Sequence, residues 1–189
     1  MSVFLLIVGV SGSGKTTLIS HIKQTYPEVV FPPSYTTRAK RPGEKSGEDY
    51  VFISREIFEK KINRNEFLEW AEYGGNLYGT DRASVYEPLQ AGRLVVKQAE
   101  VQGARQLVDT MSADHLKTIF IDAGAWPELE ARIVARAPMS KDELLQRKAR
   151  YEDEMSYKKE ANYVIHNTFG HLDAAIGELD AIIEKFIAF

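Results

Sequence analysis

The strongest constraint on the fold of this chain is the run GVSGSGKT at residues 9–16, which directly follows the apolar stretch 3–8. The run has the G-x-x-x-x-G-K-[ST] spacing of a phosphate-binding loop, with a strand-like segment before it and a helical pattern after it. Glycines let the backbone curl so that N–H groups point at phosphate oxygens, and the following helix presents its positive dipole end to the same anion. We therefore predict a nucleoside triphosphate site.

Two side chains at the end of this loop would complete the site. The Lys15 ammonium can reach the outer phosphates, and the Thr16 hydroxyl can ligate Mg²⁺. The residues that we assign to the triphosphate at this loop are Gly9, Val10, Ser11, Gly12, Ser13, Gly14, Lys15, Thr16 and Thr17.

Apolar runs and helical patterns alternate along most of the chain, which is typical of an α/β protein with a parallel sheet covered by helices on both faces. The predicted strands are 3–8, 94–96, 118–121 and 163–165, with a weaker one at 29–31, giving a parallel five-stranded sheet. The predicted helices are 15–26, 82–91, 103–111, 127–136, 141–161 and 172–186.

Residues 32–81 interrupt this rhythm, because they are rich in Gly, Pro, Tyr and charge. Short strand-like pieces such as 50–53 and a helical piece at 55–63 predict a small inserted mixed-β subdomain, and such insertions often hold a second substrate. Residues 1–31, 82–125 and 160–189 would then form the core of a single domain of residues 1–189. We expect residues 126–159 to form a mobile helical lid.

Composition excludes several classes of function. The chain has 189 residues and no cysteine, so disulfides and thiolate metal sites are excluded, and a reducing cytoplasm is the expected location. A net charge of −3 argues against nucleic-acid partners, and no apolar run approaches the roughly 20 residues that span a bilayer. We expect small-molecule substrates and no membrane partner, and we leave monomer and homodimer open.

A second anion site is suggested by Arg38 and Arg41, which lie among tyrosines in the inserted segment. Arginine offers a planar fork that matches phosphate oxygens. Taken alone, two arginines in a turn are equally compatible with a solvated basic surface.

Several motifs in combination resemble the guanylate kinase family across nearly the whole chain. They are the loop at 9–16, S-x-T-T-R-x-x-R-x-G-E at 34–44, D-Y-x-F at 49–52, E-F-L-E-W-A at 66–71 and Y-G-T at 78–80. The resemblance implies a three-layer P-loop kinase fold and phosphoryl transfer from ATP to GMP, with Mg²⁺ as cofactor. No general base is required, since a phosphate monoester with a second pKa of about 6 is already ionised at neutral pH.

The resemblance also implies roles for individual residues. GMP would be held through its phosphate by Arg38, Arg41, Tyr50 and Tyr78 and through its base by Ser34, Glu69 and Thr80, with Glu44 shaping the pocket and Glu100 at the base or sugar edge. Arg132, Arg136 and Arg147 would clamp the triphosphate, Asn167 would contact adenine, and Lys15, Arg38, Arg136 and Arg147 would be catalytic.

The chemistry of the base agrees with Glu69 as its reader. Guanine presents N1–H and N2–H donors to a carboxylate, whereas adenine would leave that carboxylate unpaired. We expect the neighbouring Trp70 to lie in the core, because large aromatic side chains are usually buried.

Residues 94–103 depart from the family pattern of an apolar strand that ends in D-x-D-x-Q-G. Gln98 stands at the first Asp, Glu100 at the second, and Lys97 replaces an apolar residue. Magnesium would then depend on Thr16, the phosphates and water, which suits an ion that keeps several waters. We hypothesise an active enzyme with weakened or altered metal dependence.

Two other functions remain as alternatives. One is a P-loop kinase for a phosphorylated sugar, such as ribose 1,5-bisphosphate phosphokinase, which would not need Glu69, Tyr78 and Thr80 together. The other is a non-catalytic guanylate-kinase-like binding module, a class that has usually lost the intact glycine loop and its lysine. Turnover with GMP distinguishes the first prediction from both.

Overall fold

The main sheet of the protein has four parallel strands in the order β6-β1-β7-β8. The computed structural model describes residues 2–48, 50–136 and 139–187. In this sheet β1 (Phe4–Gly9) is buried along its whole length between β6 (Val95–Gln98) and β7 (Leu116–Asp122), and β8 (Tyr163–His166) lies beyond β7. A strand that is buried on both faces reads as a continuous apolar run, which is why residues 3–8 carry no polar alternation.

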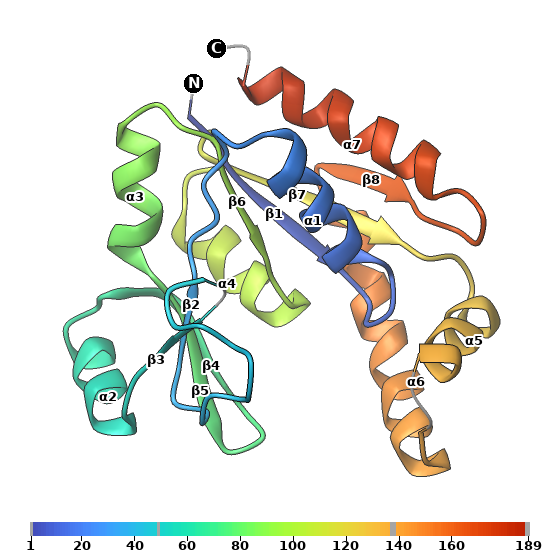
Figure 1. Ribbon diagram of the computed structural model, residues 1–189, viewed down its shortest axis with the longest axis horizontal. Helices are drawn as coiled ribbons and strands as arrows, with labels where there is room; N and C mark the ends of the chain where they lie inside the picture. The colour runs from blue at the N-terminus through green and yellow to red at the C-terminus, as the bar shows by residue number, and fades with distance from the viewer. Residues whose placement is uncertain (1, 49, 137–138, 188–189) are drawn as a thin grey trace.

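Helices cover both faces of this sheet (Figure 1). On one face Leu5 and Ile7 pack under α1 (Lys15–Thr25) and α7 (Leu172–Ile187). On the other face Leu6 and Val8 share a core with α3 (Arg82–Gln90), α4 (Val101–Thr110) and α5 (Trp126–Arg136). The three-layer α/β prediction is confirmed.

The predicted fifth strand is reduced to a single bridge. Val30 pairs in parallel with Val95, donating to Leu94 O at 2.9 Å and accepting from Val96 N at 2.8 Å. Pro32 and Pro33 follow directly and have no N–H to donate, so the ladder cannot continue.

A second sheet, in the order β3-β2-β5-β4, forms from the predicted insertion. The strands β2 (Ser34–Thr36) and β3 (Tyr50–Phe52) are parallel, whereas β2 with β5 (Asn76–Asp81) and β5 with β4 (Phe67–Tyr73) are antiparallel, so the sheet is mixed as expected. Gly74 and Gly75, with φ of 57° and 75°, form the two-residue turn between β4 and β5. Helix α2 (Arg55–Asn63) closes a small core of Phe58, Phe67 and Leu77.

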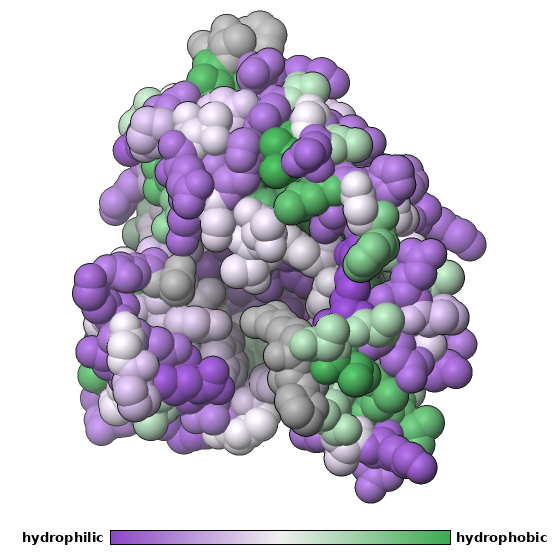
Figure 2. All heavy atoms as spheres, turned by 45° about the vertical axis from the view of Figure 1, so that its right-hand side comes forward, coloured by the Kyte–Doolittle hydropathy of each residue, from purple (hydrophilic) through white to green (hydrophobic). Residues whose placement is uncertain are grey.

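Helices α5 and α6 (Lys141–Ser156) project from the main sheet on the side opposite the second sheet (Figure 1). Ser140 and Glu143 form a capping box at the start of α6. The helix ends earlier than predicted, and a 3₁₀ turn at Tyr157–Lys159 follows it. The molecular surface is hollowed between the second sheet and the helices α5 and α6 (Figure 2). In the described part of the chain, no helix has both the length and the apolar character needed to cross a bilayer.

Candidate nucleotide and acceptor site

The glycine loop lies at the carboxyl end of β1 and leads directly into α1. Gly14, with φ of 93°, is the residue before the first helical position, and Gly12 has φ of 89°. A Cβ at Gly9 would lie 2.7 Å from the Ile121 carbonyl oxygen, so only glycine fits against β7 there. These glycines therefore give the loop the curled path that a ring of inward N–H groups requires.

Lys15 turns back over this loop. Its Nζ donates to the carbonyl oxygens of Gly9 and Val10, the second at 3.1 Å, and the side chain is buried. Burial lowers the pKa of Lys15, while the carboxylates of Glu100 and Glu154 act in the opposite direction. The ammonium is thus a poorly hydrated positive charge beside the loop, which suits it for contact with phosphate oxygens.

Residues far along the chain hold the loop from the other side. The Asn167 amide donates to Ser13 O at 2.8 Å, and Arg132 Nη1 donates to Asn167 O at 2.8 Å. Arg147 on α6 donates to Ser11 Oγ at 2.5 Å. Arg132 and Arg147 therefore both contact the loop or its support, whereas the side chain of Arg136 lies outside the described residues. The predicted contact of Asn167 with adenine stays a prediction.

The predicted acceptor residues lie around the second sheet. Arg38 donates to both Glu44 carboxylate oxygens, at 2.7 and 3.1 Å, and its guanidinium lies 5.3 Å from the Tyr50 ring centroid. Its hydrogen bonds to Glu44 raise the pKa of Arg38 and, with the Arg41 N–H, lower that of Glu44. Glu44 also accepts from Arg41 N at 2.7 Å, and the Arg41 side chain is exposed.

Three polar side chains meet at the junction of the two sheets. Ser34 and Thr80 are paired across β2 and β5, and Thr80 Oγ1 donates to Glu69 Oε1 at 2.5 Å. A Cβ at Gly103 on α4 would lie 3.3 Å from Glu69 Oε2, so this glycine leaves room for the carboxylate. Burial raises the pKa of Glu69, and the Thr80 hydrogen bond and the Lys97 charge oppose that rise.

Residues of the phosphate loop and residues of the acceptor side line one cleft with a volume of about 990 Å³. Ser11 and Thr16 of the loop line it together with Arg147 and Glu154 from α6. From the acceptor side the lining includes Ser34, Tyr50, Glu69, Tyr78, Lys97, Gln98 and Glu100. Among the predicted residues whose side chains are described, those that lie outside this lining are Gly9, Gly12, Ser13, Gly14, Lys15, Thr17, Arg38, Arg41, Glu44, Thr80, Arg132 and Asn167. A donor and an acceptor could therefore face each other across the cleft.

Comparison with known proteins agrees with this geometry. The family model described as guanylate kinase matches residues 2–186. The chain belongs to the guanylate kinase family. A guanylate kinase of Parasynechococcus marenigrum is 40% identical over 183 residues, covering 97% of this chain and 98% of the relative. One of Trichormus variabilis is 42% identical over 163 residues, covering 86% and 81%.

A solved structure shows the same fold. The guanylate kinase of Anaplasma phagocytophilum superposes with a TM-score of 0.71 at 28% identity and covers 99% of this chain and 85% of that one. The guanylate kinase motifs read from the sequence are therefore carried on the fold that the family resemblance implied.

Glu154 was missed from the sequence, because it belongs to no motif that the sequence argument used. It lies in the last turn of α6, and its carboxylate opposes the lowering of the Lys15 pKa. Gly103, which ends the Q-G pattern at 94–103, makes room for Glu69, a role that the pattern did not indicate. The expectation for Trp70 is wrong, because its side chain is 42% exposed. It lies on β4, an edge strand, and is not part of the small core of Phe58, Phe67 and Leu77.

Proposed function

We propose that this chain transfers the terminal phosphoryl group of ATP to GMP and releases ADP and GDP. The observation that carries the proposal is that Ser11 and Thr16 of the glycine loop line a single cleft with Ser34 and with Glu69, to which Thr80 donates a hydrogen bond. A phosphate loop alone would suit many nucleotide enzymes. A half-buried carboxylate paired with a hydroxyl, in the same cleft, supports a base with N–H donors as the second substrate.

The donor half consists of the loop N–H groups, Lys15 and the arginines of the lid. Gly9 to Thr17 would cradle the triphosphate, and Lys15 would offset charge on its outer phosphates. Arg147 already reaches the loop from α6, so movement of residues 126–159 as a lid would carry its guanidinium along the phosphates. We assign the same clamping role to Arg132 and Arg136.

The acceptor half would hold GMP through both ends. Arg38, Arg41, Tyr50 and Tyr78 would bind the phosphate, and Ser34, Glu69 and Thr80 would bind the base. A non-bridging oxygen of the GMP phosphate attacks the γ-phosphorus, the bond to the β,γ-bridging oxygen breaks, and that oxygen leaves on ADP. Because the attacking oxygen is already ionised at neutral pH, positioning and charge neutralisation are sufficient.

Magnesium fits the residues at the loop. Thr16, Gln98 and Glu100 line the same cleft, and they offer the oxygen donors that Mg²⁺ prefers. Within the described residues, no three His, Cys, Asp or Glu side chains gather as a metal cage, so water and phosphates would complete the shell. The ion would supply positive charge on the phosphate oxygens.

The lack of cysteine supports a cytoplasmic location.

The experiment that tests this function is an ADP-release assay with ATP and Mg²⁺, run with GMP, AMP, UMP or no acceptor. We expect turnover with GMP alone. No turnover with any nucleotide would refute the proposal. ATP binding without turnover would then point to a binding module, and turnover with a phosphorylated sugar to the alternative kinase.

A further inference from the structure

Lys97 is a buried charge that the reaction above does not use. It is the third residue of β6 and only 7% exposed, yet it forms part of the cleft wall. Its Nζ donates to Pro32 O at 3.1 Å and to Ser34 Oγ at 2.8 Å. A buried lysine is costly unless its charge is compensated, so its placement beside the acceptor residues calls for a reason.

The charge that acts on Lys97 is the Glu69 carboxylate of β4. Burial lowers the pKa of Lys97 to about 8, and Glu69 opposes that shift. In return, Lys97 opposes the burial that raises the pKa of Glu69. The two groups therefore stabilise each other's ionised forms within the wall of the cleft.

Lys97 also fixes the role of the Ser34 hydroxyl. A hydroxyl has one hydrogen to donate and two lone pairs, and the ammonium, which has only donors, occupies one lone pair. The positive charge favours the rotamer that turns the Ser34 hydrogen away from Nζ. Ser34 therefore becomes a hydrogen-bond donor toward the cleft.

We propose that Lys97 is a positioning residue that determines the base specificity of the acceptor pocket. It holds Glu69 as an acceptor and Ser34 as a donor, and that pair matches a 6-oxopurine, with its O6 acceptor and N1–H donor. A 6-aminopurine presents the opposite pattern at both atoms. The inference rests on the proposed function.

The test compares Lys97→Met, which keeps the length of the side chain and removes its charge, with the unaltered protein. The acceptors are GMP, IMP and AMP at saturating ATP. We expect KM for GMP and for IMP to rise by about tenfold or more, because a charged buried contact is lost, with kcat and KM for ATP changed by less than about twofold. The GMP-to-AMP ratio of kcat/KM should fall by about tenfold.

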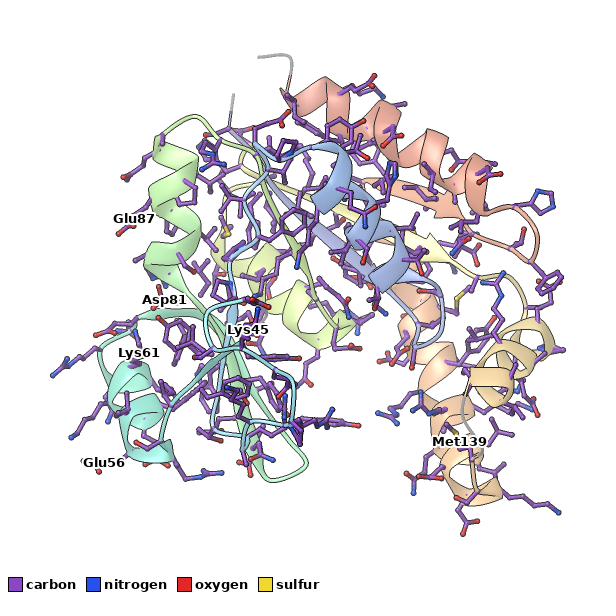
Figure 3. The ribbon with its side chains drawn as sticks, viewed as in Figure 1. Lys45, Glu56, Lys61, Asp81, Glu87 and Met139 are labelled. Atoms are coloured by element: carbon purple, nitrogen blue, oxygen red, sulfur yellow. The ribbon has the colours of Figure 1, made fainter. Side chains whose placement is uncertain are left out.

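Lys61→Met is the matched control. Lys61, on α2, is a half-buried lysine bonded to Glu66 at 2.6 Å and Asp81 at 2.9 Å, and it lies outside the cleft lining (Figure 3). This variant should lower the melting temperature without altering KM for GMP or the GMP-to-AMP ratio. An equal change of that ratio in both variants would overturn the proposal.

The split between KM and kcat distinguishes positioning from packing. A folding defect would lower kcat and the melting temperature together, whereas lost positioning raises KM for GMP while kcat stays nearly unchanged. An unchanged KM for GMP and an unchanged GMP-to-AMP ratio in Lys97→Met would also overturn the inference. If the unaltered protein does not use GMP at all, the proposed function fails instead.

Discussion

The side-chain amide of Asn167, just after β8, donates to the Ser13 carbonyl oxygen in the phosphate loop at 2.8 Å. Asn167 is itself held on two sides, because its N–H donates to Asp122 O and its carbonyl accepts from Arg132. The loop conformation therefore depends on a residue 154 positions away, and not only on its own glycines.

The first prediction concerns Gly14, whose missing side chain makes this contact possible. A Cβ there would lie 2.2 Å from Asn167 Nδ2, and φ is 93°. Gly14→Ala should reduce the free energy of unfolding by about 2–4 kcal/mol, since it adds left-handed strain and displaces a buried amide. Thermal or urea unfolding measures the change, and ATP binding should weaken with it.

Gly92→Ala is the control for strain alone. Its φ is 77°, but a Cβ there would meet nothing within 4 Å. We expect a loss of only about 1 kcal/mol. If both variants lose the same amount of stability, displacing the Asn167 amide from Ser13 O has no energetic cost.

A second prediction follows from the burial of Lys15. Lys15→Met should reduce kcat by roughly 10²–10³-fold, because it removes a charge aimed at the phosphates. Since burial already lowers the pKa of Lys15, the neutral side chain should not reduce the melting temperature. Near-normal turnover in steady-state assays would contradict the assignment of the loop.

The third prediction is for Arg147, which joins α6 to the loop through Ser11. Arg147→Ala should reduce kcat on the order of 10²-fold and leave KM for GMP nearly unchanged, because its guanidinium faces the donor side. Lys148→Ala, at the next, exposed position of the same helix, should retain activity. Equal losses in the two variants would point to damage to the helix.

The motifs and most elements were predictable from the sequence because they depend on local signals. The helix at 55–63 was placed with its observed bounds, Arg55–Asn63, and the buried run at 3–8 locates β1 to within a residue. The weak segment at 29–31 was overestimated, because a strand also needs N–H donors beyond Val30 and two prolines remove them.

The contacts that shape the site were not predictable in the same way. Lys97 was recognised as a departure from the family pattern, but only the fold shows that its ammonium meets Ser34 and faces Glu69. These residues come from three strands, and no sequence spacing encodes their approach. Glu154 was missed for the same reason, since a carboxylate in a polar helix normally faces solvent.

A fourth prediction concerns the ion pair between Asp122, at the end of β7, and Lys158, in the 3₁₀ turn that follows α6. Burial raises the pKa of Asp122, but hydrogen bonds from Lys158 Nζ at 2.6 Å and Gly124 N at 2.9 Å outweigh it, so the net pKa is lowered. A carboxyl group whose pKa is lowered by folding stabilises the fold at pH values above its ordinary pKa of about 3.9. This stabilisation is lost as the pH falls through the pKa of the folded state. Asp122→Asn should therefore melt on the order of 2–4 °C lower at pH 7.

The pH dependence is the sharper part of that test. The difference in melting temperature should begin to shrink as the pH falls below about 4, where the unfolded chain is protonated, and should vanish only once Asp122 is protonated in the folded state as well. The exposed Asp109, on α4, serves as control, and Asp109→Asn should leave the melting temperature unchanged at either pH. A difference for Asp122→Asn that persists at low pH would show that the ion pair with Lys158 is not its cause.

The last prediction concerns Gln98, where the family pattern places an aspartate. Gln98 lies at the end of β6, in the cleft wall with Thr16 and Glu100. Gln98→Asp adds a carboxylate to a set of oxygen donors that has one, so the Mg²⁺ concentration for half-maximal turnover should fall by about tenfold, in line with the stronger hold of carboxylates on this ion. Gln146→Asp makes the same charge change on the exposed surface of α6 and should leave the Mg²⁺ requirement unaltered. If a magnesium titration gives the same midpoint and the same kcat for Gln98→Asp as for the unaltered protein, then the amide at this position is not what sets the metal dependence, and the shell is complete without it.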